Sequence, residues 1–127
     1  MNPWFKTTAL AMVGLSILMF SACKTSQPGV KNVAGTYSEM IDATPPQVTA
    51  AAQEVLNQMK LLGVEAESTD LDGKVTARTA QDKTVTVRVE KQSSHVSRMR
   101  VRVGRLGDQA ISITILEKIK EKLSSGE

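Results

Sequence analysis

The chain has 127 residues, enough for one domain, and its 16 basic and 13 acidic side chains give a formal net charge of +3. This excess is too small for the electrostatic footprint of a nucleic-acid-binding protein. Aromatic residues make up 3% of the chain, which excludes the stacking platforms of single-strand binders and the aromatic walls of most ligand pockets.

The first 22 residues have the pattern of a secretory signal peptide. Lys6 precedes an uncharged apolar run from Ala9 to Phe20, and two small residues follow before Cys23. The run has 12 residues, whereas a helix needs roughly 20 to cross a bilayer. We therefore expect residues 1–22 to be cleaved from the chain.

Cys23 is the single cysteine of the chain. The sequence FSAC at 20–23 resembles the lipobox of bacterial lipoproteins, with Phe20 where leucine is usual. In a lipobox the cysteine receives a diacylglyceryl group and becomes the acylated N-terminus. Each buried acyl CH₂ contributes about 0.8 kcal/mol, so two or three chains anchor a protein stably. The alternatives for Cys23 are a reactive thiol or an intermolecular disulfide.

Residues 23–35 are expected to be the lipidated N-terminus and a flexible tether, and residues 36–127 a single domain. The stretch KTSQPGVKNVAG mixes Lys, Ser, Gln, Pro and Gly without hydrophobic periodicity. A strand is predicted over 36–43. A helix is predicted over 45–62, because Thr44 and Gln47 form a capping box and Gly63 is a natural stop.

Four strands are predicted after this helix, at 64–69, 73–80, 84–91 and 96–103, since valines alternate there with polar residues and turn residues separate the runs. A last helix is predicted from Asp108 onward, with an Ile/Leu side and lysines near its end. The expected fold is α+β: an antiparallel sheet with two helices on one face, in the order β-α-β-β-β-β-α.

The outward side of the predicted sheet is rich in arginine. The candidate anion contacts are Arg88, Arg98, Arg100 and Arg102, of which the last three share one face of a strand by period-two geometry. They indicate either a surface for phosphate groups or an acidic partner, or a solvated face with ordinary cross-strand pairing.

Loop lengths predict the partners of these charges. With a three-residue loop at 93–95, Glu90 lies opposite Arg98 and Arg88 opposite Arg100. With a three-residue loop at 81–83, Lys74 lies opposite Glu90. The first hairpin, between the strands at 64–69 and 73–80, can set Glu65 opposite Arg78. Part of the face would then be neutralised by opposite charges, at about 0.2–1 kcal/mol a pair.

Enzymatic chemistry finds little support in the sequence. His95 is the single histidine, so a His-based triad or a multi-histidine metal site is excluded. Asp70-x-Asp72-Gly73 opens like a calcium loop but lacks the later ligands and fits a hairpin turn. We expect no catalytic residues, no cofactor, no metal and no nucleic acid.

The order of motifs resembles an uncharacterised family of small bacterial lipoproteins that is classed only as a domain of unknown function. The motifs are the Thr-Pro-x-x-Val helix start, LLGV at 61–64, GKVTARTAQDKTVTVRV and RVGRLGDQAISITILEKI at 102–119. The resemblance implies an outer-membrane or periplasm-facing lipoprotein, and Lys24 after the cysteine favours the outer membrane. The expected function is a non-enzymatic, lipid-anchored envelope protein acting through protein contacts. The alternative is an anionic-lipid or glycolipid binder using the basic sheet face.

Overall fold

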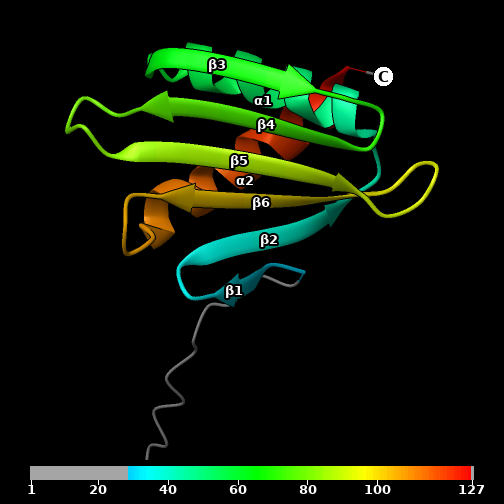
Figure 1. Cartoon of the computed structure of the whole chain (residues 1–127), viewed down its shortest axis with the longest axis horizontal. Coiled ribbons are helices and arrows are strands. Elements are labelled where there is room, and N and C mark those ends of the chain that lie inside the picture. The colour runs from blue at the N-terminus through cyan, green and yellow to red at the C-terminus, as the bar shows by residue number, and fades with distance from the viewer. Residues whose placement is uncertain (1–28, 127) are drawn as a thin grey trace, which may run out of the picture.

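The computed structural model describes residues 29–126, so the predicted signal peptide and Cys23 lie outside the described residues. The described part forms one six-stranded antiparallel sheet and two helices, and both helices cover the same face of the sheet (Figure 1). The elements are β1 (Lys31–Val33), β2 (Thr36–Ile41), α1 (Pro45–Gln58), β3 (Leu62–Ser68), β4 (Asp72–Arg78), β5 (Thr84–Lys91), β6 (Ser97–Val103) and α2 (Gln109–Ser125).

The strand order across the sheet is β1-β2-β6-β5-β4-β3. Helix α1 packs on β3, β4 and β5, and α2 packs on β6 and β2. The predicted α+β class, the antiparallel sheet, the two helices on one face and the element order from residue 36 onward are confirmed. The opposite face of the sheet has no covering layer in the described part of the chain (Figure 1).

Strand β1 was not predicted, because its residues were assigned to the tether. It pairs with β2 through a two-residue turn at Ala34 and Gly35, whose φ angles are +49° and +79°. Positive φ at both positions is the mirror-image turn that suits the twist of a hairpin. The side-chain oxygen of Asn32 accepts a hydrogen bond from the Gly35 N–H at 3.1 Å. The folded domain therefore begins before residue 36.

Helix α1 begins where the sequence predicts and ends four residues early. The Gln47 side chain accepts the Thr44 backbone N–H at 3.0 Å, as in a capping box. At the other end Lys60 takes a left-handed conformation, with φ of +58°, and the Leu61 N–H bonds to the Leu56 carbonyl at 3.1 Å. This bond closes the helix, so Leu62 begins β3 instead of extending α1.

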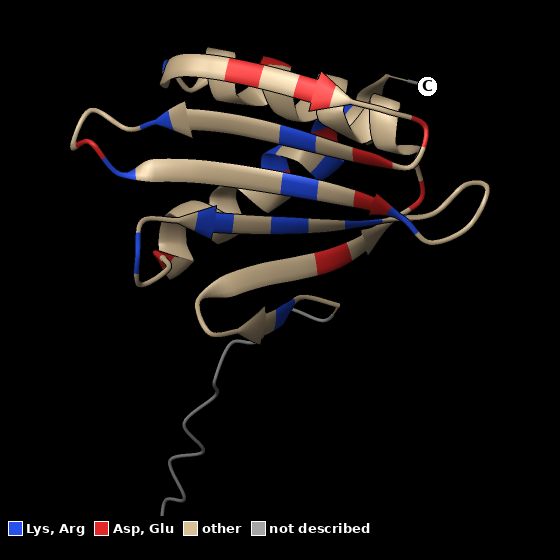
Figure 2. Ribbon diagram, in the orientation of Figure 1, with Lys and Arg blue, Asp and Glu red and all other residues tan. Residues whose placement is uncertain are grey.

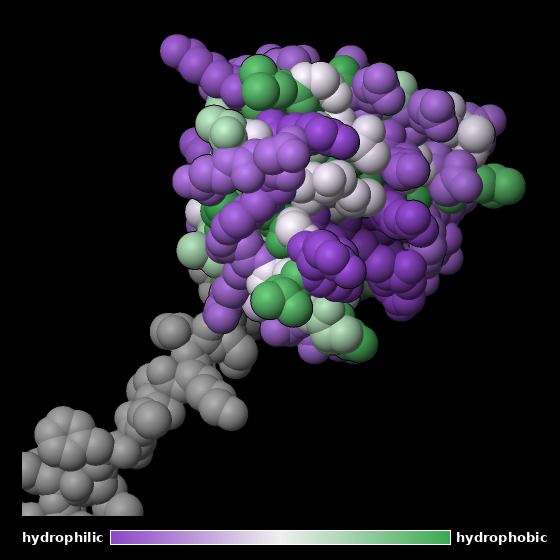
Figure 3. All heavy atoms as spheres, turned by 60° about the vertical axis from the view of Figure 1, so that its left-hand side comes forward, coloured by the Kyte–Doolittle hydropathy of each residue, from purple (hydrophilic) through white to green (hydrophobic). Residues whose placement is uncertain are grey.

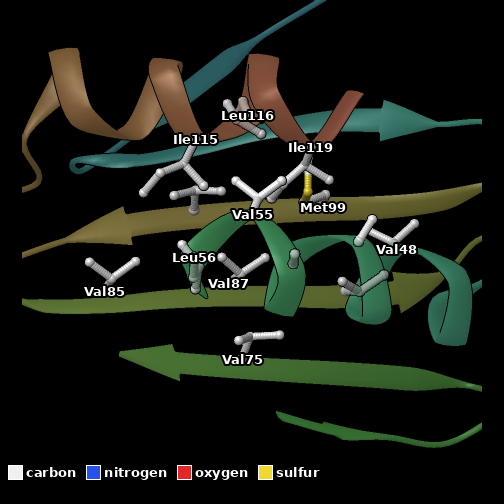
Figure 4. Close-up of a cluster of buried hydrophobic side chains, with 14 of the residues drawn as sticks. Val48, Val55, Leu56, Val75, Val85, Val87, Met99, Ile115, Leu116 and Ile119 are labelled. Carbon is white, nitrogen blue, oxygen red and sulfur yellow. The ribbon is translucent and has the colours of Figure 1, made fainter. Parts of the chain in front are cut away.

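The core lies between the sheet and the helices and is aliphatic (Figure 4). Its one aromatic side chain within residues 29–126 is Tyr37, which is 5% exposed and receives a hydrogen bond from the Asn32 amide at 3.0 Å. The largest fully buried side chains are Val48, Leu56, Val75, Val85, Val87, Val89, Met99, Val101, Val103, Ile115, Leu116 and Ile119. Since side chains alternate along a strand, these inward valines turn the intervening Lys and Arg residues to the uncovered face.

Candidate anion-binding face

Basic side chains lie in one row across the uncovered face of the sheet. Lys74 of β4 lies opposite Arg88 of β5, and Arg88 lies opposite Arg100 of β6. On the other side of Arg100 the row continues through Ser38 of β2 to Lys31 of β1. Figure 2 shows the basic positions of β4, β5 and β6 aligned near the middle of the sheet. Lys31, Lys74, Arg88 and Arg100 are called the basic row below.

Three members of the basic row form no ion pair within the described residues, although Glu67 of β3 lies opposite Lys74. Among residues 29–126, no ion pair involves Lys31, Lys74 or Arg88, whereas Arg100 Nη1 contacts Glu90 Oε1 at 2.9 Å. Like charges directly opposite each other on a sheet are destabilising. The Lys74–Arg88–Arg100 register is therefore not explained by the stability of the sheet.

The four predicted anion contacts divide into two groups. Arg88 is exposed and Arg98 is half-buried. Neither side chain takes part in an ion pair or hydrogen bond within the described residues. Arg100 is held by Glu90 through one nitrogen. Arg88 and Arg98 thus have free guanidinium groups, and Arg100 keeps part of its donor capacity.

Arg102 instead fastens two loops of the protein itself. Its Nη1 donates to the Ala34 carbonyl at 3.1 Å and to Thr36 Oγ1 at 3.3 Å. Its Nε donates to the Gly104 carbonyl at 3.4 Å, and its Nη2 donates to the Arg105 carbonyl. All three guanidinium nitrogens are engaged, so Arg102 links the β1–β2 turn to the loop after β6. This is a structural role.

The predicted register is confirmed on one side of β5 and wrong on the other. Glu90 lies opposite Arg98 and Arg88 opposite Arg100, as the 93–95 loop predicted. Lys74 does not lie opposite Glu90, because Arg78 pairs with Thr84 and leaves a five-residue connection, 79–83. The Thr79 N–H bonds to the Lys83 carbonyl at 2.9 Å and closes this connection.

The β3–β4 register is also different from the predicted one. Glu65 lies opposite Thr76, and Leu62 lies opposite Arg78. An irregularity between Leu62 and Glu65 shifts the pairing at this end of β3. Glu65 therefore does not neutralise Arg78, which pairs with Asp82 in the connection instead, at 2.9 Å.

Lys31 and Lys74 were missed as candidate residues. Lys31 was placed in the tether and Lys74 beside an acid. The sequence holds one signal for Lys31, which is Gly35, a residue that readily takes the positive φ of a hairpin turn. For Lys74 the signal is the alternation along its strand. Because Val75 and Ala77 point into the core, Lys74 points outward, and a register shift of two residues does not change this.

A groove of about 480 Å³ lies at the β1 side of the uncovered face. It is called the edge groove, and its lining residues are Gly29, Lys31, Val33, Thr36, Ser38, Glu39, Met40, Arg98 and Arg100. It combines three cations with two hydroxyls and two apolar side chains. Among residues 29–126, the other exposed large apolar residues are Leu62, Leu71 and Leu106. Figure 3 shows hydrophobic side chains as separate patches on a mostly hydrophilic surface.

The N-terminus of α2 is occupied by a side chain of the protein. Asp108 Oδ1 accepts the Ile111 N–H at 3.1 Å, and Asp108 Oδ2 lies 3.3 Å from Lys83 Nζ. The Ile111 hydrogen bond, and next the Lys83 ammonium, hold the pKa of Asp108 below its ordinary value of 3.8. This carboxylate caps the helix that the sequence predicts from Asp108 onward.

Two further observations concern the described residues alone. Within 29–126, His, Cys, Asp and Glu side chains do not gather in groups of three or more that could hold a metal ion. No helix in the same range is both long and apolar enough to cross a membrane. His95 is exposed in the β5–β6 turn.

Comparisons with known proteins place the chain in a family. No curated protein matches it significantly. A solved structure, the di-domain ARO/CYC StfQ from the steffimycin biosynthetic pathway, is 16% identical over 72% of this chain, with a TM-score of 0.34. The chain spans 43% of the length of that protein. The model of the family described as "Protein of unknown function (DUF3568)" matches residues 6–122. The chain therefore belongs to the DUF3568 family.

Proposed function

We propose that this protein is a non-enzymatic, lipid-anchored protein of the bacterial cell envelope whose uncovered sheet face binds the phosphate groups of an anionic membrane. The observation that carries the proposal is the register of Lys74, Arg88 and Arg100, which sets like charges directly opposite each other. An anionic surface offsets that repulsion, and clustered Lys and Arg side chains are attracted to anionic headgroups. The proposed location is the outer membrane, facing the periplasm.

The lipid anchor is supported by FSAC and by the position of the first strand. Lys31 lies eight positions after Cys23, and even fully extended this stretch spans about 29 Å at most. Lys31 belongs to the edge strand β1 and to the basic row. An acylated Cys23 would therefore keep this edge of the sheet close to the lipid headgroups.

Contact with an anionic surface has more support than contact with a protein partner. A protein interface calls for a contiguous exposed apolar patch. The exposed large apolar side chains lie on separate elements: β1, β2, the start of β3, the β3–β4 turn and the β6–α2 loop. On the uncovered face, in contrast, Lys31, Lys74, Arg88 and Arg98 lie together without an ion pair among residues 29–126.

Lysine footprinting on the protein isolated from cells tests the proposal. The protein is placed in phosphatidylcholine vesicles with or without phosphatidylglycerol and treated with a water-soluble acetylating reagent. Lys74 lies on the uncovered face, and Lys118 lies exposed on α2, on the other side of the sheet. We expect acetylation of Lys74 to fall several-fold in the anionic vesicles alone, acetylation of Lys118 to stay constant, and high salt to reverse the difference.

Two controls define the outcome. Arg88→Gln should weaken the protection of Lys74, while Lys118→Gln, with the same loss of charge, should not. Equal acetylation of Lys74 in both kinds of vesicle would overturn the basic-face proposal. The mass of the isolated protein tests the anchor: an acylated N-terminal Cys23 is expected, and an intact Met1 or an unmodified thiol would overturn it.

A further inference from the structure

We infer that the edge groove holds the phosphate of one anionic phospholipid from the leaflet that anchors the chain, so that the β1 side of the uncovered face lies nearest the bilayer. This inference rests on the proposed function and adds a specific site, a ligand class and an orientation. A general attraction between a basic face and a membrane requires no specific site, no particular lipid and no fixed orientation.

The lining of the edge groove is matched to a phosphate group. Lys31, Arg98 and Arg100 supply positive charge. The Thr36 hydroxyl accepts a hydrogen bond from Arg102 and keeps its own proton to donate, whereas the Ser38 hydroxyl already donates to the Lys31 carbonyl at 3.5 Å. Arg98 has no intramolecular ion pair in the described part of the chain, and Lys31 has none either. These two cations are free to bind an anion.

The acid in the lining does not cancel these charges. Glu39 is 10% exposed at its side chain, and its Oε1 lies 2.7 Å from Lys120 Nζ of α2. In the sheet Glu39 pairs with Met99, whose side chain is fully buried, so Glu39 shares the parity of the helix-covered face. Its charge is already paired with a lysine from the opposite side of the sheet.

The other grooves of the uncovered face are less suited to an anion. The groove over β3, β4 and β5 is lined by three acids and two cations, namely Glu67, Asp72, Glu90, Lys74 and Arg88. In the groove at the β4–β5 connection, Arg78 is paired with Asp82 and Arg102 is engaged by backbone carbonyls. Lys83 of the same groove pairs with Asp108, which leaves Arg105 as its one lining cation without an ion pair or hydrogen-bonded side chain among residues 29–126. The edge groove has two such cations, Lys31 and Arg98.

The apolar residues of the groove favour a lipid over free phosphate. Val33 is 72% exposed and Met40 is 49% exposed, and both line the groove beside the cations. Inorganic phosphate would use the cations and leave these side chains in water. A phospholipid would place its headgroup on Lys31 and Arg98 and its glycerol or upper acyl carbons against Val33 and Met40.

The position of the anchor supports the same ligand. The described chain starts at Gly29, itself a lining residue of the edge groove. Cys23 lies six residues before Gly29, a distance of about 22 Å at full extension. If Cys23 is acylated, headgroups of the same leaflet are within reach of the groove at high local concentration.

The test uses the protein isolated from cells in the same two kinds of vesicle, with acetylation of Lys31 as the readout for the groove and of Lys74 for the wider face. We expect phosphatidylglycerol to protect Lys31 several-fold. Arg98→Gln should remove most of this protection, and the matched Arg78→Gln, at the far end of the face, should not. Met40→Gln should also weaken the protection of Lys31. Since Arg98 and Met40 are both partly exposed, thermal unfolding should show that these two variants remain folded.

The outcomes separate the inference from the proposed function. Protection of Lys74 without protection of Lys31 would overturn the groove site and leave the basic-face proposal standing. Protection of neither lysine would overturn both. If inorganic phosphate added to phosphatidylcholine vesicles protects Lys31 as strongly as phosphatidylglycerol does, the lipid assignment is wrong and the groove is a free-phosphate site. If Met40→Gln has no effect, the apolar contact that favours a lipid is wrong.

Discussion

Replacing Gly73 with alanine should destabilise the protein, because this glycine holds β4 against α1. Gly73 is buried, and a Cβ atom there would lie far inside the van der Waals contact distance from Thr49 Oγ1, which belongs to α1. The φ of Gly73 lies outside the positive region, so space alone decides the effect of the substitution. Its neighbour Lys74 points the other way and belongs to the basic row.

The expected cost follows from the contacts of the added methyl group. Besides Thr49 Oγ1, it would lie 3.2 Å from Thr49 Cβ and 3.6 Å from the Glu67 carbonyl. Overpacking of this kind costs roughly 1–3 kcal/mol, and alanine returns a fraction of that by restricting the unfolded chain. We expect a net loss of about 2 kcal/mol, or about 10 °C in melting temperature for a domain of this size.

Thermal unfolding followed by circular dichroism, in zwitterionic micelles, measures the effect. Thr49 is 3% exposed and its Oγ1 has no hydrogen-bond partner, so Thr49→Ala by itself should change stability little. The double variant Thr49→Ala/Gly73→Ala should recover at least about 1 kcal/mol of the loss, which a double-mutant cycle resolves. Unchanged stability in Gly73→Ala, or additive effects in the double variant, would refute this account of the α1–β4 contact.

Three other predictions follow from single contacts. Arg102→Gln should lower stability by about 1–2 kcal/mol in chemical denaturation, because the loops lose a charged donor, whereas Arg88→Gln should leave it equal or slightly higher; equal losses would contradict the distinction. Ser97→Ala should cost about 1–3 kcal/mol, since the fully buried Ser97 hydroxyl donates to the Ala43 carbonyl at 2.7 Å, and an intact melting temperature would argue against it. The folded pKa of Asp108 lies below its unfolded value of 3.8. The stability that the Asp108 carboxylate contributes is therefore complete above pH 3.8 and is lost as the pH falls through the folded pKa. Between these pH values, the free energy of unfolding should fall less steeply for Asp108→Asn than for the unsubstituted protein, and parallel curves would contradict the prediction.

Much of the fold follows from local patterns in the sequence. The alternation of Val85, Val87 and Val89 with polar residues predicts a half-buried strand, and burial confirms it. The capping box at Thr44 predicts the start of α1. These signals are reliable because they depend on neighbours within one turn or one pleat of the chain.

The first strand shows where local patterns fail. Lys31–Val33 has only three residues and is exposed throughout, so no hydrophobic alternation marks it as a strand. It is fixed by its pairing with β2 and by the backbone contact between Gly35 and the Leu106–Gly107 loop, where a Cβ at Gly35 would not fit. That contact joins segments about seventy positions apart and cannot be deduced from composition.

The sequence alone determined which side chains face outward and, through FSAC, predicted an anchor at Cys23. Only the tertiary structure decided which charges oppose one another: Lys74 meets Arg88 and not Glu90, and Arg102 is engaged by carbonyls of two distant loops. The physical reason is the period of the strand. A shift of two residues keeps every valine in the core while giving every outward charge a new partner, so hydrophobic patterning fixes the face and the closure of the connections fixes the register.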